Sequence, residues 1–154
     1  MRVLCIGDVV GSRGCNFVRE KLPQLKKFYN IDAVICNGEN SADGNGITPE
    51  SAEQLFLAGA DVITGGNHSL RRSEIYNLLD ENPYILRPHN LPEAKYGSGY
   101  TVIDFGKFQM AAQSAVKSPG GILLHHTLAV GRIADNDTGL CRQAHFGSVA
   151  VFEG

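Results

Sequence analysis

The sequence has no long hydrophobic run and no closely spaced cysteine pair. No apolar stretch approaches the ~18 residues that a membrane-spanning helix requires. The first residues are typical of a strand and not of a signal peptide. The cysteines are Cys5, Cys15, Cys36 and Cys141, and none forms a Cys-x-x-Cys pair. We therefore expect reduced thiols that pack as small hydrophobic groups in a cytoplasmic protein without a membrane partner.

Positive charge is not in excess either. The chain has 14 Lys and Arg against 16 Asp and Glu, for a formal net charge of −2. Such a balance creates no basic field to attract a polyanion, so long nucleic acid is not an expected partner. The 154 residues, 43% of them hydrophobic, are enough for one globular domain with a buried core.

Short β-forming runs alternate with helical patterns along most of the chain. The predicted strands are 2–8, 32–40, 61–68 and 84–92, followed by a hairpin over 99–111 that turns near Gly106 and Lys107. The predicted helices lie between the first four strands, over about 17–28, 48–59 and 71–81. After residue 110 only 121–126 and 148–152 are strand candidates.

Each helix carries a signature of its own. The first has an apolar face of Phe17, Val18, Leu22, Leu25 and Phe28, and Pro23 should kink or restart it. The second has Thr48 as N-cap, Pro49 at its first position and Gly59 as its stop. The third should turn Ile75, Leu78 and Leu79 inward.

This alternation predicts an α/β fold with a mostly parallel sheet. The near-continuous apolar strands predict that helices cover both faces. We expect an α/β core over residues 1–110 and a divergent or truncated tail of the same domain over 111–154. An incomplete sheet would leave an open edge, which favours a homo-oligomer or a partner chain.

Polar residues follow three of the predicted strands where each one ends: Asp8 after the first, Glu39 and Asn40 after the second, Asn67 and His68 after the third. The tips are about 30 residues apart, the length of one βα unit, so right-handed crossovers bring them together. Two carboxylates with no nearby Lys or Arg would repel each other unless a cation binds. The donors suit manganese, iron, zinc or magnesium.

Simpler interpretations remain open for each element. Asp8 could be only a helix N-cap, Glu39 and Asn40 ordinary loop polarity, and Gly65-Gly66 a plain turn. Gly7, Gly11 and Gly14 form G-x-x-x-G-x-x-G, which differs from the dinucleotide-binding pattern. The runs DGNG and DNDTG lack the ligand pattern of a calcium loop and are better explained as turns.

Together the runs GDVVG, NGEN and GGNH, with the later RPHNLP, resemble the YmdB-like branch of the calcineurin-like metallophosphoesterases. The resemblance covers residues 1 to about 110. It implies a metallophosphoesterase fold and a two-metal phosphodiesterase acting on small phosphodiesters such as 2′,3′-cyclic nucleotides. It implies divalent or trivalent metal ions, with iron as first choice and manganese, zinc or magnesium as alternatives.

The same resemblance assigns roles by position. It implies that Asp8 binds the first metal ion, Glu39 bridges two, and Asn40 is a ligand or holds the reactive water. Asn67 would bind the second metal ion, with His68 as general acid.

The family's later histidine ligands include a His-x-His pair, which this sequence lacks. His125 and His126 are the candidate replacements for a strand-end histidine. The alternative function is a catalytically weak nucleotide- or metal-binding fragment that needs a partner chain.

Overall fold

The computed structural model describes residues 1–91, 96–116, 131–132, 142–146 and 149–153, the last three segments by their backbone only. The strands are β1 (Arg2–Ile6), β2 (Ala33–Asn37), β3 (Val62–Thr64), β4 (Ile85–Leu86), β5 (Tyr100–Asp104), β6 (Gln109–Gln113), β7 (Gly131–Arg132), β8 (Arg142–Phe146) and β9 (Val149–Glu153). The helices are α1 (Gly11–Tyr29), α2 (Pro49–Ala58) and α3 (Tyr76–Glu81), with the 3₁₀ turn η1 (Ser73–Ile75) directly before α3.

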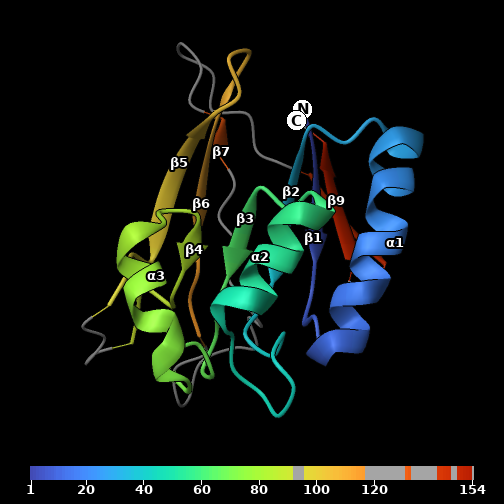
Figure 1. Ribbon diagram of the computed structural model, residues 1–154. Coiled ribbons are helices and arrows are strands. Elements are labelled where there is room, and N and C mark those ends of the chain that lie inside the picture. Colours follow the sequence, from blue (N-terminus) through green and yellow to red (C-terminus); the bar gives the residue numbers. More distant parts are fainter. Residues whose placement is uncertain (92–95, 117–130, 133–141, 147–148, 154) are drawn as a thin grey trace.

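The main sheet has the strand order β4-β3-β2-β1-β9-β8 (Figure 1). Strands β1 to β4 pair in parallel, and β9 and β8 add two antiparallel pairings beyond β1. The α/β fold and the parallel arrangement of the first four strands are therefore confirmed. Parallel order places the carboxyl ends of β1, β2 and β3 on the same edge, where α/β proteins bind ligands.

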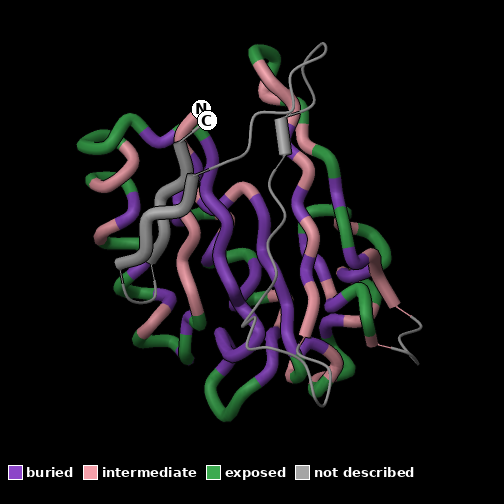
Figure 2. The backbone as a smooth tube through the Cα atoms, turned by 180° about the vertical axis from the view of Figure 1, so that it is seen from behind, coloured by how far each residue is buried: buried purple, intermediate pink, exposed green. Residues whose placement is uncertain are grey.

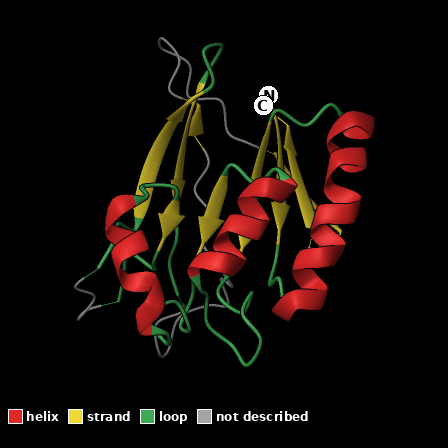
Figure 3. Cartoon of the chain, in the orientation of Figure 1, coloured by secondary structure: helices red, strands yellow, loops and turns green. Residues whose placement is uncertain are grey.

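The prediction of helices on both faces is wrong for the described part of the chain. All three α-helices lie on one face of the main sheet (Figure 3), where Val18, Leu55 and Leu79 join the core around Val34 and Ile63. The other face packs against the second sheet, β5-β6-β7. Figure 2 shows that rear side, with the central strands buried.

The second sheet covers the rear face because buried and partly buried residues alternate along its middle strand, β6. Met110 and Ala112 of β6 are buried against Ile35, Val62 and Leu86 of the main sheet. The residues between them lie only partly buried. A strand of period two buries one face only, so a hairpin closes this side of the core in place of a helix.

Helix α1 runs unbroken through Pro23, so the predicted restart is wrong. Pro23 lies on the solvent-exposed side, where water can bind the backbone carbonyl that loses its helical partner. The inward face includes Cys15, Val18 and Leu22, and the predicted Leu25 packs against the core while partly exposed. Phe17 and Phe28, predicted to face inward, are 63% and 77% exposed because they lie outside this narrower stripe.

The other helix and strand signatures are mostly confirmed. Thr48 caps α2 through the Ser51 amide, Pro49 is its first residue, and Gly59 ends it in the left-handed conformation. Ile75 of η1 and Leu79 of α3 are buried, whereas Leu78 of α3 is only partly buried.

The hairpin of β5 and β6 turns through Gly106, as predicted. The strand predicted at 148–152 appears as β9, while β8 was not expected. The strand candidate 121–126 lies outside the described residues.

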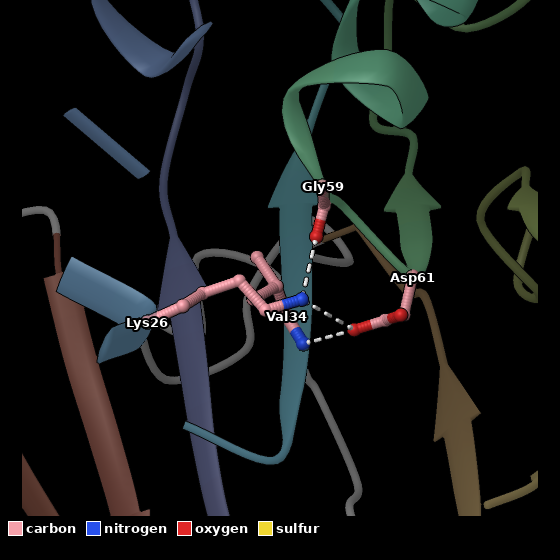
Figure 4. Close-up of polar contacts among 4 residues, drawn as sticks. All are labelled: Lys26, Val34, Gly59 and Asp61. Atoms are coloured by element: carbon pink, nitrogen blue, oxygen red, sulfur yellow. Dashed lines mark hydrogen bonds and ion pairs between the residues drawn. The ribbon is translucent and has the colours of Figure 1, made fainter. Parts of the chain in front are cut away.

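A polar contact joins α1 to the start of β3 (Figure 4). Asp61 Oδ2 accepts a hydrogen bond of 2.7 Å from the Val34 amide and lies 3.9 Å from Lys26 Nζ. Lys26 Nζ also donates to the Gly59 carbonyl oxygen at 3.2 Å. Burial, followed by the nearby Asp61 charge, raises the pKa of the Cys36 thiol to about 12, so this thiol stays protonated.

We predict that Asp61→Ala lowers the free energy of unfolding by roughly 1–2 kcal/mol, because it leaves the buried Val34 amide without its acceptor. The Lys26 contact adds little, since both side chains are partly exposed. The matched variant Asp61→Asn keeps an acceptor oxygen and should retain most of the stability. Urea unfolding followed by circular dichroism measures both. Equal stability of Asp61→Ala and the wild type would contradict the assignment.

Among the described helices, none combines the length and the apolar content that crossing a membrane would require.

Candidate active site at the carboxyl edge of the sheet

The segments that follow β1, β2 and β3 meet at the carboxyl edge of the main sheet, at the bottom of Figure 1. Two backbone hydrogen bonds join the first two of them: the Val9 amide donates to the Asn37 carbonyl oxygen, and the Gly11 amide to that of Asn40. The Gly38 amide donates to the Thr64 carbonyl oxygen and so ties the second segment to β3. Glu39 therefore lies on the same edge as Asp8.

A chain of side-chain hydrogen bonds connects all three tips. Asn40 Nδ2 donates to Asp8 Oδ1 at 2.7 Å, and Asn40 Oδ1 lies 2.7 Å from His68 Nδ1. A carboxylate only accepts, so Asp8 fixes the orientation of the Asn40 amide. The amide oxygen then faces His68, which must carry a hydrogen on Nδ1. Nε2 is therefore the His68 nitrogen that can exchange a proton with a ligand.

Glu39 is buried, with 6% of its surface exposed. Its Oε2 accepts a hydrogen bond of 3.3 Å from the His68 amide. Among the described residues no Lys or Arg is recorded in an ion pair with Glu39; the pairs Lys21–Glu20 and Lys26–Asp61 lie elsewhere. A buried carboxylate without a cationic partner is costly, which argues against ordinary loop polarity for Glu39 and Asn40.

The two glycines before Asn67 leave room for the side chains of Glu39 and Ser69. A Cβ atom on Gly66 would lie 1.7 Å from Glu39 Oε2, and one on Gly65 would lie 2.0 Å from Ser69 Oγ. Ser69 Oγ accepts from the Gly66 amide at 2.7 Å and donates to its carbonyl oxygen at 2.8 Å. Gly66 is thus more than a plain turn residue, because it lets the Glu39 carboxylate reach the third tip.

Asn67 is exposed and lies between Gly66 and His68, which both contact Glu39. No contact of the Asn67 side chain with the other predicted site residues is recorded in the described part of the chain. The structure therefore brings Asp8, Glu39, Asn40 and His68 into contact, and these four residues form the cluster described below. Asn67 is held beside them by its position in the chain.

Asp43 and Arg72 support the cluster, although neither was a predicted site residue. Asp43 Oδ1 accepts a hydrogen bond of 2.9 Å from the Ser12 amide in the first turn of α1. The Arg72 guanidinium donates to the carbonyl oxygens of Asp43, at 2.5 Å, and Asn45, at 2.8 Å. The segment after β3 is thereby bonded to the segment after β2. The segment after β2 in turn caps the N-terminus of α1 through Asp43.

These contacts decide two of the alternatives. The N-cap of α1 is Val10 and makes no side-chain cap, so Asp8 does not serve as one. The amides of Gly11 and Ser12 are already bonded to Asn40 and Asp43. A pyrophosphate would need such amides at the helix N-terminus, so a dinucleotide-binding loop is not favoured.

The chemistry of the cluster fits a hard or borderline cation. It gathers carboxylate and amide oxygens with no compensating Lys or Arg among the described residues. In the same part of the chain no three His, Cys, Asp or Glu residues form a complete metal-binding group. The described residues would therefore supply only part of the ligands that a metal ion needs. His125 and His126 lie outside the described residues.

The sequence profile of the YmdB-like protein family matches residues 4–120. The Bacillus subtilis (strain 168) protein named 2′,3′-cyclic-nucleotide 2′-phosphodiesterase is 46% identical over 103 residues, which cover 67% of this chain and 39% of that protein. A crystal structure of a novel phosphatase from Mycoplasma pneumoniae matches with a TM-score of 0.71 and 30% identity, over 83% of this chain and 46% of that one. A hypothetical protein from Thermus thermophilus matches with a TM-score of 0.68 and 36% identity, over 75% and 44%.

The fold is thus α/β and of the metallophosphoesterase type. The chain belongs to the YmdB-like protein family. The profile match extends about ten residues beyond the predicted end of the resemblance near residue 110. The chain spans less than half the length of each of these three relatives.

Proposed function

We propose that this chain carries the strand-tip part of a metal-dependent phosphodiesterase site for small phosphodiesters such as 2′,3′-cyclic nucleotides. The observation that carries the proposal is the hydrogen-bonded chain Asp8–Asn40–His68, with the buried Glu39 carboxylate beside it. The name of the Bacillus subtilis relative supports this substrate class.

In the proposed site Asp8, Glu39, Asn40 and Asn67 would hold two metal ions. Iron is the first choice, and manganese, zinc and magnesium are alternatives for oxygen donors. When bound, such ions polarise the phosphate and make water a better nucleophile. Asn67 contributes a neutral oxygen and so adds no third negative charge against an anionic substrate.

His68 is the proposed general acid. Asn40 Oδ1 accepts the Nδ1 hydrogen, so the proton to be transferred sits on Nε2 of the imidazolium ring. Delivering it to the leaving alkoxide oxygen breaks the ester bond without forming a high-energy alkoxide. Asp8 contributes at a distance, because its bond to Asn40 Nδ2 keeps the amide oxygen turned toward the ring.

Hydrolysis of adenosine 2′,3′-cyclic monophosphate by the purified chain tests this function. We expect opening of the cyclic phosphate with iron or manganese present and its loss when EDTA removes the metal. Restoration by added metal is the control for damage by the chelator. Hydrolysis that is indifferent to EDTA, or absent with every metal, would contradict the proposal.

The second candidate is a binding fragment that completes its site with a partner chain or a second copy. The incomplete ligand group among the described residues favours it. A chain that binds metal only after such a partner is added would support this candidate over the first.

A further inference from the structure

A hollow of about 260 Å³ lies beside the cluster, between the segment that follows β1 and the segment that follows β2. The residues that line it include Val10, Gly11, Arg13, Ala42, Asp43 and Asn45. Val10 is two residues from Asp8, and Ala42 is two residues from Asn40. The Gly11 amide bonds the Asn40 carbonyl oxygen, so the hollow and the cluster share a wall.

We propose that this hollow binds the nucleoside part of the substrate while its phosphate lies at Asp8, Glu39 and His68. The inference rests on the proposed function and specifies which half of the substrate gives selectivity. The volume is slightly below the ~300–1,000 Å³ usual for ligand pockets, which suits one base with its sugar. A longer nucleic acid would not fit within it.

The lining offers what a planar base needs. Val10 is 56% exposed, so an apolar side chain stands uncovered at the rim. Arg13 is exposed and has no hydrogen-bond or ion-pair partner recorded among the described residues. A guanidinium can stack on a base or donate to its ring acceptors, and Asn45 adds an amide at the same rim.

The Asp43 carboxylate in the hollow is already hydrogen-bonded to the protein backbone. Asp43 Oδ1 accepts from the Ser12 amide, at the positive end of the α1 dipole. The shape of this wall is held from behind, since Arg72 bonds two of its carbonyl oxygens. The left-handed residues Gly44 and Asn45 give the wall its tight curvature. A preformed wall of this kind spares a ligand the entropy cost of ordering it.

The test compares two cyclic phosphodiesters, one with a base and one without. Binding of adenosine 2′,3′-cyclic monophosphate and of glycerol 1,2-cyclic phosphate is measured by calorimetric titration with manganese present, in the His68→Ala protein, where hydrolysis is slow. We expect Arg13→Ala to weaken binding of the nucleotide about tenfold, within the range of an arginine–ring contact. Binding of the base-free ligand should stay unchanged.

Two further variants separate ring contact from general charge. Arg13→Lys keeps the charge but loses the planar group, so it should recover only part of the nucleotide affinity. Arg19→Ala removes an arginine from the exposed side of the same helix, away from the hollow, and should change neither affinity.

The result that overturns the inference is an equal loss for both ligands, or no loss for either, in Arg13→Ala. A metal-loaded parent protein, with Arg13 intact, that binds neither ligand would overturn it as well. Arg13-dependent binding without metal-dependent hydrolysis would keep the nucleoside site and remove the catalytic proposal. If the chain hydrolyses the nucleotide and Arg13→Ala leaves the KM unchanged, the catalytic proposal stands and the nucleoside site is wrong.

Discussion

Replacing His68 with alanine is expected to lower turnover of a 2′,3′-cyclic nucleotide by about 10²–10⁴-fold, the usual contribution of a positioned general acid. Metal content should remain nearly unchanged, because the structure engages the ring with Asn40 and leaves Nε2 for the substrate. Turnover is measured under saturating substrate, and bound metal by elemental analysis of the same preparation.

Asn67→Ala is the matched variant for that measurement, since it alters the neighbouring side chain. It should lose metal as well as turnover if Asn67 is a ligand. A His68→Ala protein that loses its metal, or keeps its turnover, would show that His68 is a ligand or a bystander.

A methyl group at Gly66 is expected to abolish metal binding and turnover together. The Cβ atom of Gly66→Ala would fall 1.7 Å from Glu39 Oε2 and 2.3 Å from Glu39 Cδ. Glu39 is too buried to move aside cheaply, and overpacking of this kind costs about 1–3 kcal/mol of stability. Relief of the clash would turn the carboxylate away from the third tip.

Gly106→Ala is the control for this substitution. An added Cβ there meets nothing within 4 Å, although its φ of +79° makes any side chain strained. It should cost about 1–3 kcal/mol of stability and leave metal binding intact. Thermal unfolding and metal content, measured for both variants, separate the two effects. A Gly66→Ala protein with normal metal content would contradict the role given to this glycine.

The strand tips could be predicted because the βα repeat dictates their position. Strand, helix and loop lengths near 30 residues place Asp8, Glu39 and Asn67 on one edge whatever the details of packing. The contact between Asn40 and His68 could not be predicted, since it depends on how two loops turn their side chains.

Asp43 and Arg72 escaped prediction for a related reason. Both act mainly on backbone atoms of distant segments, and such bonds leave no periodic pattern in a sequence. The packing of the second sheet on the rear face, in contrast, could have been predicted from the sequence of β6. Polar and small residues alternate with buried ones in β6, and this period of two indicates a sheet packed on one side.

Phe17 and Phe28 show where a helical period misleads. Counting apolar residues placed them on the inward stripe, but α1 covers its share of the sheet with Cys15, Val18 and Leu22, and with the partly buried Leu25. A wide apolar face does not reveal which part of it meets the core. The predicted division at residue 110, the cytoplasmic location and the homo-oligomer remain predictions.

Metal content of the wild-type chain and of Glu39→Gln shows whether the carboxylates at the strand tips hold metal. Both proteins are loaded with iron or manganese, freed of excess metal and measured by elemental analysis. Glu50→Gln, on the exposed side of α2, is the matched control. We expect about two metal ions per chain in the wild type and the control, and a loss of metal in Glu39→Gln. A wild-type chain without metal, or a Glu39→Gln protein that retains it in full, would show that the strand-tip carboxylates are not metal ligands.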